Sequence, residues 1–209
     1  SINFTGNDNT SYIHAGLDNG TRYYYKVASV NHSIGLGPLS SEISTITIAE
    51  PPGNMSATGG SDNVTLSWSS AAGADNYTIY WSTSSGVNNS SNSINFTGND
   101  NTSYIHAGLD NGTRYYYKVA SVNSGGIGGL SNEVSAMTDL AAPDNVSATG
   151  GSEQVILSWN KMNGADNYTI YWSTSSGVDN SSNSINITGN DNNTYIHFGL
   201  DNDTRYYYK

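Results

Sequence analysis

Short runs in which apolar and polar residues alternate recur along the chain. The run VTLSW at 64–68 puts its valine, leucine and tryptophan on one face of an extended strand, and YTIYW at 77–81 and YYYKVASV at 115–122 alternate in the same way. Segments rich in glycine and asparagine, such as TGGSDN, AAGADN and GLDNGT, separate the runs and are typical of turns. Many short strands between such turns predict an all-β fold built as a β-sandwich.

The chain repeats this pattern almost without change. Residues 1–31 recur letter for letter at 93–123, and a close variant begins at Ser184. A period of about 92 residues corresponds to one small domain rather than to one turn of a solenoid. The predicted organisation is the C-terminal half of one repeat at 1–48, a complete repeat at 50–140, and the N-terminal part of a third repeat at 142–209.

Both ends of the chain fall inside a repeat. Lys209 stops within the strand that corresponds to 115–122, and Ser1 begins partway through a domain. Two explanations stay open: the chain is a stretch of a longer array, or incomplete repeats of different molecules complete one another. The segments between repeats, TIAEPP at 47–52 and TDLAAP at 138–143, are short and contain proline, which stiffens them.

Composition restricts the partners of the chain. Charged residues make up 11% of it, against about 25% in a typical globular protein, so 28 asparagines, 32 serines and 19 threonines must keep the surface hydrated. With seven basic residues and a net charge of −10, the chain has too little positive charge to neutralise nucleic-acid phosphates or to bind an anionic membrane. No run of about 18 apolar residues predicts membrane insertion of this segment.

The sequence gives little support for a bound metal ion or cofactor. The chain has no cysteine, which excludes disulfides, thiolate zinc sites and a cysteine nucleophile. His14, His106 and His197 occupy one position of the repeat without the spacing of a metal motif, so we expect no metal ion and no cofactor. The loops GNDN at 98–101 and GLDN at 108–111 offer oxygen ligands for Ca²⁺, although aspartate and asparagine are also common turn residues.

Several motifs resemble the fibronectin type III family. The Pro-x-Asn-x-Ser-Ala-Thr segments at 52–58 and 143–149 are similar to its first strand, and the Val-x-Leu-x-Trp run is similar to its second strand, with Trp68 and Trp159 as core tryptophans. The segment Leu-Asp-Asn-Gly-Thr-Arg-Tyr at 109–115 resembles the corner before its sixth strand. The resemblance covers nearly the whole chain and implies tandem seven-stranded, immunoglobulin-like β-sandwiches.

The same resemblance implies roles for two sets of residues that face the core, the corner tyrosines and a histidine. It implies that Tyr23, Tyr115 and Tyr206 are tyrosine-corner residues, whose hydroxyl groups bond to nearby backbone. Alternation in YIHAGL puts His106 on the inward face, where the family usually has an aliphatic residue. Either this histidine is half-buried and hydrogen-bonded, or the strand register shifts at this point.

The Asn-x-Ser/Thr sequence, which is the acceptor of N-linked glycans, is unusually frequent. It occurs 18 times, whereas chance predicts about 7 because serine and threonine make up about a quarter of the chain. Copying between repeats lowers the number of independent occurrences, but an excess persists. The predicted glycosylation sites are Asn3, Asn9, Asn19, Asn31, Asn54, Asn63, Asn76, Asn88, Asn89, Asn95, Asn101, Asn111, Asn145, Asn167, Asn180, Asn186, Asn192 and Asn202.

Eight of these sequons have an apolar middle residue. Because residues i and i+2 of a strand share a face, an inward apolar residue sends the asparagine and the hydroxyl toward water, where a bulky glycan fits. Asparagine and threonine are also ordinary residues of turns and strand surfaces, so a purely structural role is the alternative. The eight are Asn3, Asn54, Asn63, Asn76, Asn95, Asn145, Asn167 and Asn186.

Catalysis is not expected from this chain. No Ser-His-Asp arrangement or pair of carboxylates stands out, and near-identical tandem repeats are an unusual place for an active site. Four tyrosines expected on the outer surface of one sheet are of more interest. They either stabilise the sheet as cross-strand pairs or contact sugar rings or a neighbouring subunit, and they are Tyr80, Tyr116, Tyr171 and Tyr207.

The sequence thus predicts a structural segment of a secreted, heavily N-glycosylated repeat protein, outside the cell or on its surface, that forms a fibre, stalk or surface layer. Its expected partners are further copies of itself, in a fibre or long array, and its own glycans. The alternative is an adhesin, or a polysaccharide-binding or spacer module of a larger extracellular protein or glycoside hydrolase.

Overall fold

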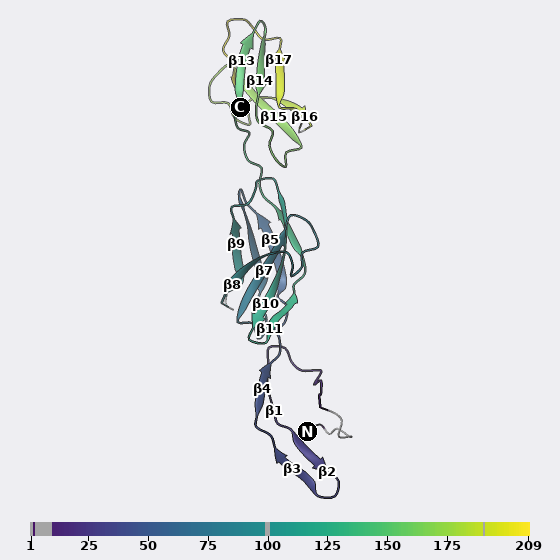
Figure 1. Ribbon diagram of the computed structural model, residues 1–209. Coiled ribbons are helices and arrows are strands. Elements are labelled where there is room, and N and C mark those ends of the chain that lie inside the picture. The colour runs from purple at the N-terminus through teal and green to yellow at the C-terminus, as the bar shows by residue number, and fades with distance from the viewer. Residues whose placement is uncertain (1, 3–9, 99–100, 190) are drawn as a thin grey trace. The chain divides into compact units, whose positions relative to one another are not determined.

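The computed structural model describes residues 2, 10–98, 101–189 and 191–209, and within them every regular element is a β-strand (Figure 1). The predicted all-β fold is confirmed. The chain divides into two compact units. The first comprises Ser1–Ala57, Leu66–Tyr104 and Tyr116–Ser135, and the second comprises Thr58–Thr65, Ile105–Tyr115 and Ala136–Lys209.

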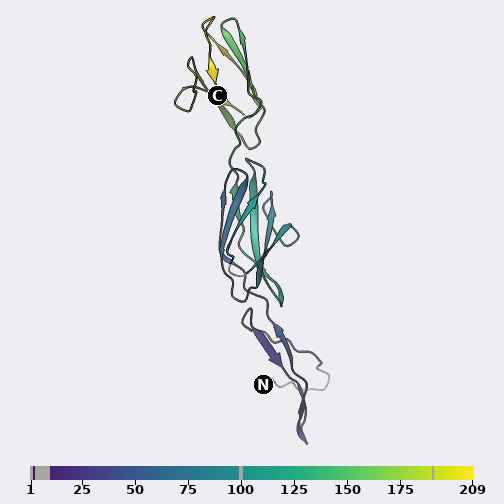
Figure 2. The same cartoon turned by 90° about the vertical axis from the view of Figure 1, so that its left-hand side faces the viewer.

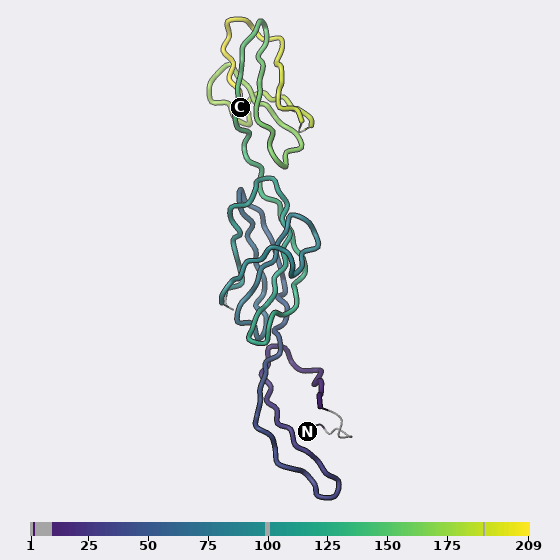
Figure 3. Tube along the Cα trace, in the orientation of Figure 1, coloured from purple at the N-terminus to yellow at the C-terminus, as the bar shows by residue number. Residues whose placement is uncertain are grey.

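The strands are short, as expected for a sandwich, and their path can be followed along the trace (Figure 3). In the described part of the chain they are β1 Arg22–Tyr25, β2 Ala28–Asn31, β3 Gly35–Leu39, β4 Ile43–Ile46, β5 Gly53–Gly59, β6 Asn63–Ser69, β7 Asn76–Ser82, β8 Asn92–Thr97, β9 Ser103–Ala107, β10 Arg114–Asn123, β11 Gly126–Leu130, β12 Val134–Met137, β13 Ser147–Gly151, β14 Gln154–Ser158, β15 Asn167–Ser173, β16 Asn183–Thr188, β17 Thr194–Phe198 and β18 Tyr207–Tyr208.

The largest sheet is built around β7. Its strands follow the order β11-β10-β7-β8, with β12 also paired to β10 (teal and blue in Figure 2). The antiparallel register of β7 and β10 places Ile79 opposite Val119, and both side chains are completely buried. Nearer the N-terminus, β1 pairs with β4 and β2 pairs with β3, both antiparallel.

A second sheet, of order β5-β6-β9, supplies the other layer of this sandwich. On β6, Val64, Leu66 and Trp68 are at most 5% exposed, while the residues between them face solvent, as the alternation predicted. The Trp68 indole packs edge-on against Tyr77 of β7 and Phe96 of β8, with ring centroids 5.4 and 6.1 Å apart. These contacts place β6 against the β7–β8 part of the large sheet.

The C-terminal strands form two three-stranded sheets of order β13-β14-β17 and β16-β15-β18. Trp159 meets Tyr168 edge-on with centroids 5.3 Å apart, which is the contact that Trp68 makes with Tyr77. The repeated sequence therefore produces a repeated packing arrangement. The buried core here consists of Leu157, Trp159, Ala165, Tyr168, Ile170 and Ile187.

The predicted tyrosine corners are confirmed in all three repeats. The hydroxyl groups of Tyr23, Tyr115 and Tyr206 each accept a hydrogen bond from the backbone N–H of the aspartate five residues earlier, at 3.0, 3.1 and 3.1 Å. Each phenol thus satisfies a backbone donor of the turn that precedes its own strand, which fixes the corner. Tyr115 is buried, and Tyr23 and Tyr206 are half-buried.

The sequon at Asn145 departs from the prediction. Val146 was expected to point inward, but it is 54% exposed because β13 begins only at Ser147. Asn145 and its counterpart Asn54 have φ angles of 49° and 50°, in the left-handed region that asparagine tolerates better than most residues. Backbone conformation alone therefore favours asparagine at these two positions.

Replacing Tyr115 by phenylalanine removes the corner acceptor and leaves the backbone N–H of Asp110 without it. We expect Tyr115→Phe to lower the free energy of unfolding by about 1–3 kcal/mol, measured by chemical denaturation. Tyr24→Phe is the control, because Tyr24 is 62% exposed, and it should leave the unfolding midpoint unchanged. Equal midpoints for the two variants would contradict a stabilising corner.

Candidate glycan-bearing surface

The predicted glycan acceptors lie at the surface. Asn3 and Asn9 are outside the described residues, and none of the other sixteen is buried. Three of them, Asn63, Asn76 and Asn111, are half-buried. The remaining thirteen are exposed, namely Asn19, Asn31, Asn54, Asn88, Asn89, Asn95, Asn101, Asn145, Asn167, Asn180, Asn186, Asn192 and Asn202.

The sequons at Asn76 and Asn95 lie on neighbouring antiparallel strands and interlock. The register of β7 and β8 sets Asn76 opposite Thr97 and Thr78 opposite Asn95, so each asparagine faces the threonine of the other sequon. The Thr78 hydroxyl donates to Asn95 Oδ1 at 3.2 Å, and the backbone N–H of Gly98 donates to Asn76 Oδ1 at 3.0 Å. We call this arrangement, and its counterpart on β15 and β16, the paired sequons.

The third repeat builds its paired sequons in the same way. Asn167 lies opposite Thr188, and Thr169 lies opposite Asn186. The Thr169 hydroxyl donates to Asn186 Oδ1 at 3.1 Å, and the backbone N–H of Gly189 donates to Asn167 Oδ1 at 3.0 Å. Sequence reasoning missed the pairing, and the available signal was the constant spacing of 19 residues, from 76 to 95 and from 167 to 186.

The apolar middle residues of the paired sequons point inward as predicted, with Tyr77 at 1% and Ile187 at 9% exposure. One hydroxyl does not reach water as expected: Thr78 is 7% exposed. It lies between Asn95 on β8 and Ala120 on β10, which cover it from both sides. Its hydroxyl therefore serves the cross-strand bond rather than hydration.

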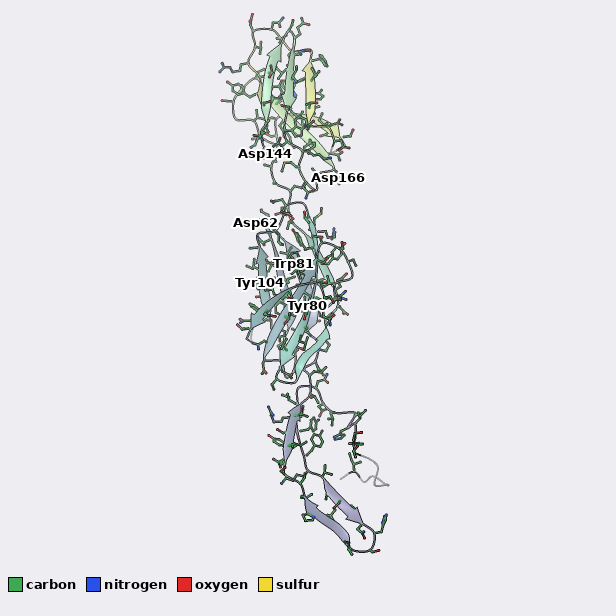
Figure 4. The ribbon with its side chains drawn as sticks, viewed as in Figure 1. Asp62, Tyr80, Trp81, Tyr104, Asp144 and Asp166 are labelled. Carbon is green, nitrogen blue, oxygen red and sulfur yellow. The ribbon has the colours of Figure 1, made fainter. Side chains whose placement is uncertain are left out.

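Tyr80 lies on β7 in the middle repeat (Figure 4), and its ring is not open to solvent. It points away from the main core as predicted, but the prediction that it faces solvent is wrong, because it is 5% exposed. It packs with Val87 and Ala120 in a second small cluster, and the half-buried side chains of Tyr116 and Leu130 lie against that cluster. This packing favours a stabilising role for the Tyr80 ring.

The remaining three tyrosines of the predicted face, Tyr116, Tyr171 and Tyr207, are half-buried. Tyr171 is held by two backbone hydrogen bonds, both 2.9 Å, with Lys209. A contact of these rings with sugar or with a neighbouring subunit stays a prediction.

A carboxylate holds the loop that covers Tyr80. Glu133 Oε2 accepts hydrogen bonds from the backbone N–H groups of Val87 at 2.7 Å and Gly86 at 3.0 Å, and Oε1 accepts one from the Ser85 hydroxyl at 2.8 Å. Desolvation acts to raise the pKa of Glu133, but these hydrogen bonds and the charge of Lys118 outweigh it, so the pKa lies below its ordinary value. Sequence reasoning missed this contact.

The repeated histidine lies on the inward side of its strand, as the alternation predicted. On β9 and β17 the tyrosine and the histidine are half-buried, and the residues on either side of them are exposed. His197 Nδ1 lies 3.1 Å from the Tyr208 hydroxyl, and its ring meets Trp172 edge-on at 4.9 Å. His14 Nδ1 makes the same contact with the Tyr25 hydroxyl at 3.2 Å. Of the two explanations left open by the sequence, a half-buried, hydrogen-bonded histidine is the correct one at His197, whereas His14 is hydrogen-bonded but exposed.

Burial lowers the pKa values of His106 and His197 below the ordinary value of 6.5. Within the described residues, no group of three or more histidine, aspartate or glutamate side chains could hold a metal ion. Two residues of the 98–101 loop, Asn99 and Asp100, lie outside that part of the chain. The described residues also contain no helix long and apolar enough to cross a membrane.

Tandem β-sandwiches with a tryptophan-centred core and tyrosine corners define the class of this protein. The family model described as the fibronectin type III domain matches residues 50–137. This segment therefore belongs to the fibronectin type III family, and the chain, which repeats its sequence, consists of tandem domains of that type, as the resemblance predicted. Domains of this family are commonly non-catalytic structural or adhesion modules found outside cells. The predicted repeat boundaries at 48–50 and 140–142 stay predictions.

Solved structures of tandem fibronectin type III domains are similar to the chain. The FN1–FN3 domains of chicken CNTN1 share 19% identity, with a TM-score of 0.38, over 88% of this chain and 70% of that one. A segment of two fibronectin type III domains from chicken tenascin shares 18% identity, with a TM-score of 0.49, over 75% of this chain and 87% of that one. The comparison with curated proteins found no match.

Removing the negative charge of Glu133 weakens its hold on the loop. We expect Glu133→Gln to lower the free energy of unfolding by about 1 kcal/mol and to speed backbone hydrogen exchange at Gly86 and Val87. Glu42→Gln is the matched control, since Glu42 makes only an exposed ion pair with Lys26 at 3.8 Å among the described residues. Unchanged exchange at both loop amides would show that the carboxylate does not hold them.

The half-buried histidines make stability depend on pH. Because the folded state lowers their pKa, the unfolded chain binds more protons, so stability is fully present above pH 6.5 and is lost as the pH falls through the lower folded values. We expect His106→Gln combined with His197→Gln to flatten this loss in denaturant titrations between pH 7 and about 5. His32→Gln, at an exposed histidine, should leave the slope as it is, and an equally steep slope in the double variant would contradict the assignment.

Proposed function

We propose that this chain is a segment of a secreted, N-glycosylated tandem-repeat protein that builds an extracellular fibre, stalk or surface layer. The observation that supports the proposal best is the placement of its sequons, since none of the sixteen described acceptor asparagines is buried. A glycan must project into solvent. Strand alternation provides that geometry repeatedly without weakening the core.

The low charge of the chain supports the same proposal. Its two ion pairs among the described residues, Lys26–Glu42 and Lys161–Asp191, lie at the surface, where such pairs contribute little to stability. Hydration of this surface therefore depends on neutral polar groups. A coat of sugars on the asparagines adds hydration and steric bulk that does not weaken as salt increases.

The mechanism of such a protein is mechanical and steric. The middle and C-terminal repeats are held by aromatic cores rather than by disulfides, and proline-containing segments of a few residues join the repeats. Reach grows with the number of repeats, and association with further copies extends it into a fibre or layer. We assign no catalytic role, because the exposed His14 and the half-buried His197 each contact a tyrosine hydroxyl instead of a second catalytic group.

A polysaccharide-binding module or adhesin has weaker support. That alternative relied on an open tyrosine face, and Val87 covers the Tyr80 ring. Sugar binding by this face would have to use the half-buried rings of Tyr116, Tyr171 and Tyr207.

Glycopeptide mass spectrometry on natively produced protein tests the proposal. We expect sugar on most of the sixteen described acceptor asparagines, because none of them is buried and each carries the acceptor motif. Bare asparagines throughout would contradict a glycan-bearing scaffold and would leave a plain fibronectin type III spacer. The matched peptides of protein made in a bacterial cytoplasm provide the unmodified control masses.

A further inference from the structure

The hydrogen bonds of the paired sequons determine which atom of each side-chain amide faces the protein. The backbone N–H groups of Gly98 and Gly189 can only donate, so the atoms that face them on Asn76 and Asn167 must be Oδ1. The Nδ2 atoms of these two asparagines lie on the other side of the amide and donate to no described residue. A glycan attached at Nδ2 would leave the Oδ1 bonds in place.

Asn95 and Asn186 are anchored by the same atom. Each uses Oδ1 to accept the hydroxyl of the threonine across the strand pair, Thr78 or Thr169. Both asparagines are exposed. In both repeats, therefore, the two asparagines of the paired sequons bind the fold through oxygen and leave nitrogen, the atom that carries a glycan, toward solvent.

Asn111 has the opposite arrangement. Its Nδ2 donates to the backbone carbonyl of Ser61 and, at 3.3 Å, to that of Asp139. Carbonyl oxygens only accept, so the atom between them must be the nitrogen, and both of its hydrogens are used. A glycan would replace one of these hydrogens and break a bond that joins two loops. Asn111 thus has the acceptor motif but a structural role.

The paired sequons lie beside an unguarded sheet edge. β8 ends the order β11-β10-β7-β8, and β16 begins the order β16-β15-β18. Exposed edge strands pair readily with other chains, and proteins usually guard them with lysine, proline or a bulge. These two strands read NSINFT and NSINIT, without charge or proline, and short uncharged strands of this kind favour association.

We propose that glycans on Asn95 and Asn186 of the edge strands, with second glycans on Asn76 and Asn167, shield β8 and β16 from pairing with other chains, while Asn111 stays bare. Diagonal positions on neighbouring strands are about 7–8 Å apart, so both sugars of a pair flank the same edge. Each is larger than the roughly 4.8 Å spacing at which another strand must dock. The inference rests on the proposed function, because it requires that the chain is glycosylated.

The test compares two double variants of the full chain secreted from a host that attaches N-linked glycans. Asn95→Gln with Asn186→Gln removes the edge glycans. Asn89→Gln with Asn180→Gln, in the preceding exposed loops, removes equally many glycans elsewhere. Sedimentation velocity measures association, and glycopeptide mass spectrometry measures occupancy at Asn76, Asn95, Asn111, Asn167 and Asn186.

We expect the edge variant to associate at a concentration roughly tenfold lower than the loop variant. Adding Ser93→Lys and Ser184→Lys on the same strands should restore the behaviour of the loop variant, because lysine guards an edge without sugar. Without glycans, the wild-type chain and the edge variant should associate alike. This control shows that the effect in the secreted edge variant comes from the lost sugar and not from the lost hydrogen bond between threonine and asparagine.

Equal association of the two secreted variants would overturn the shielding role. Sugar on other sequons with bare paired sequons, or a fully glycosylated Asn111, would overturn the assignment of sites while leaving the proposed function intact. Bare asparagines at every sequon would overturn both.

Discussion

The two-residue period of a β-strand is the constraint on which this structure depends. Inward positions are filled by large rings, with Trp68 against Tyr77 in one repeat and Trp159 against Tyr168 in another, and burial of such rings supplies most of the stability of a domain without disulfides. Residues next to an inward ring then face outward, and those that reach solvent are mostly polar. This chain fills those positions with asparagine, serine and threonine, so acceptor sequons arise on the strand surfaces themselves.

The two-residue alternation of inward and outward side chains also explains what could be predicted from the sequence. The inward faces of 64–68 and 115–122, the tyrosine corners and the half-buried histidine all follow from alternation or from the family motifs, and the structure confirms them. Alternation failed at Val146, where the strand had not yet begun, and at Tyr80, where a loop covers the outward side chain. Whether a second segment covers an outward residue depends on tertiary contacts that a local pattern does not contain.

The contact between Glu133 and the Ser85–Val87 loop illustrates the same limit. The partners are up to 48 residues apart, and an acidic residue near the start of a last strand has no distinctive local context. The interlocking of the paired sequons is likewise a property of the β7–β8 register. One residue of slippage in β8 would send Asn95 to the face opposite Asn76, so the motif alone is not sufficient to place the pair.

Asparagine has two roles in this protein, and the orientation of its amide separates them. Measuring hydrogen exchange of side-chain amide protons by NMR on ¹⁵N-labelled, unglycosylated chain tests this most directly. The account predicts slow exchange for the Nδ2 protons of Asn111, which are bound to two carbonyls, and rapid exchange for those of Asn76 and Asn95, whose oxygens hold the fold. Rapid exchange at Asn111 together with protection at Asn76 and Asn95 would contradict it.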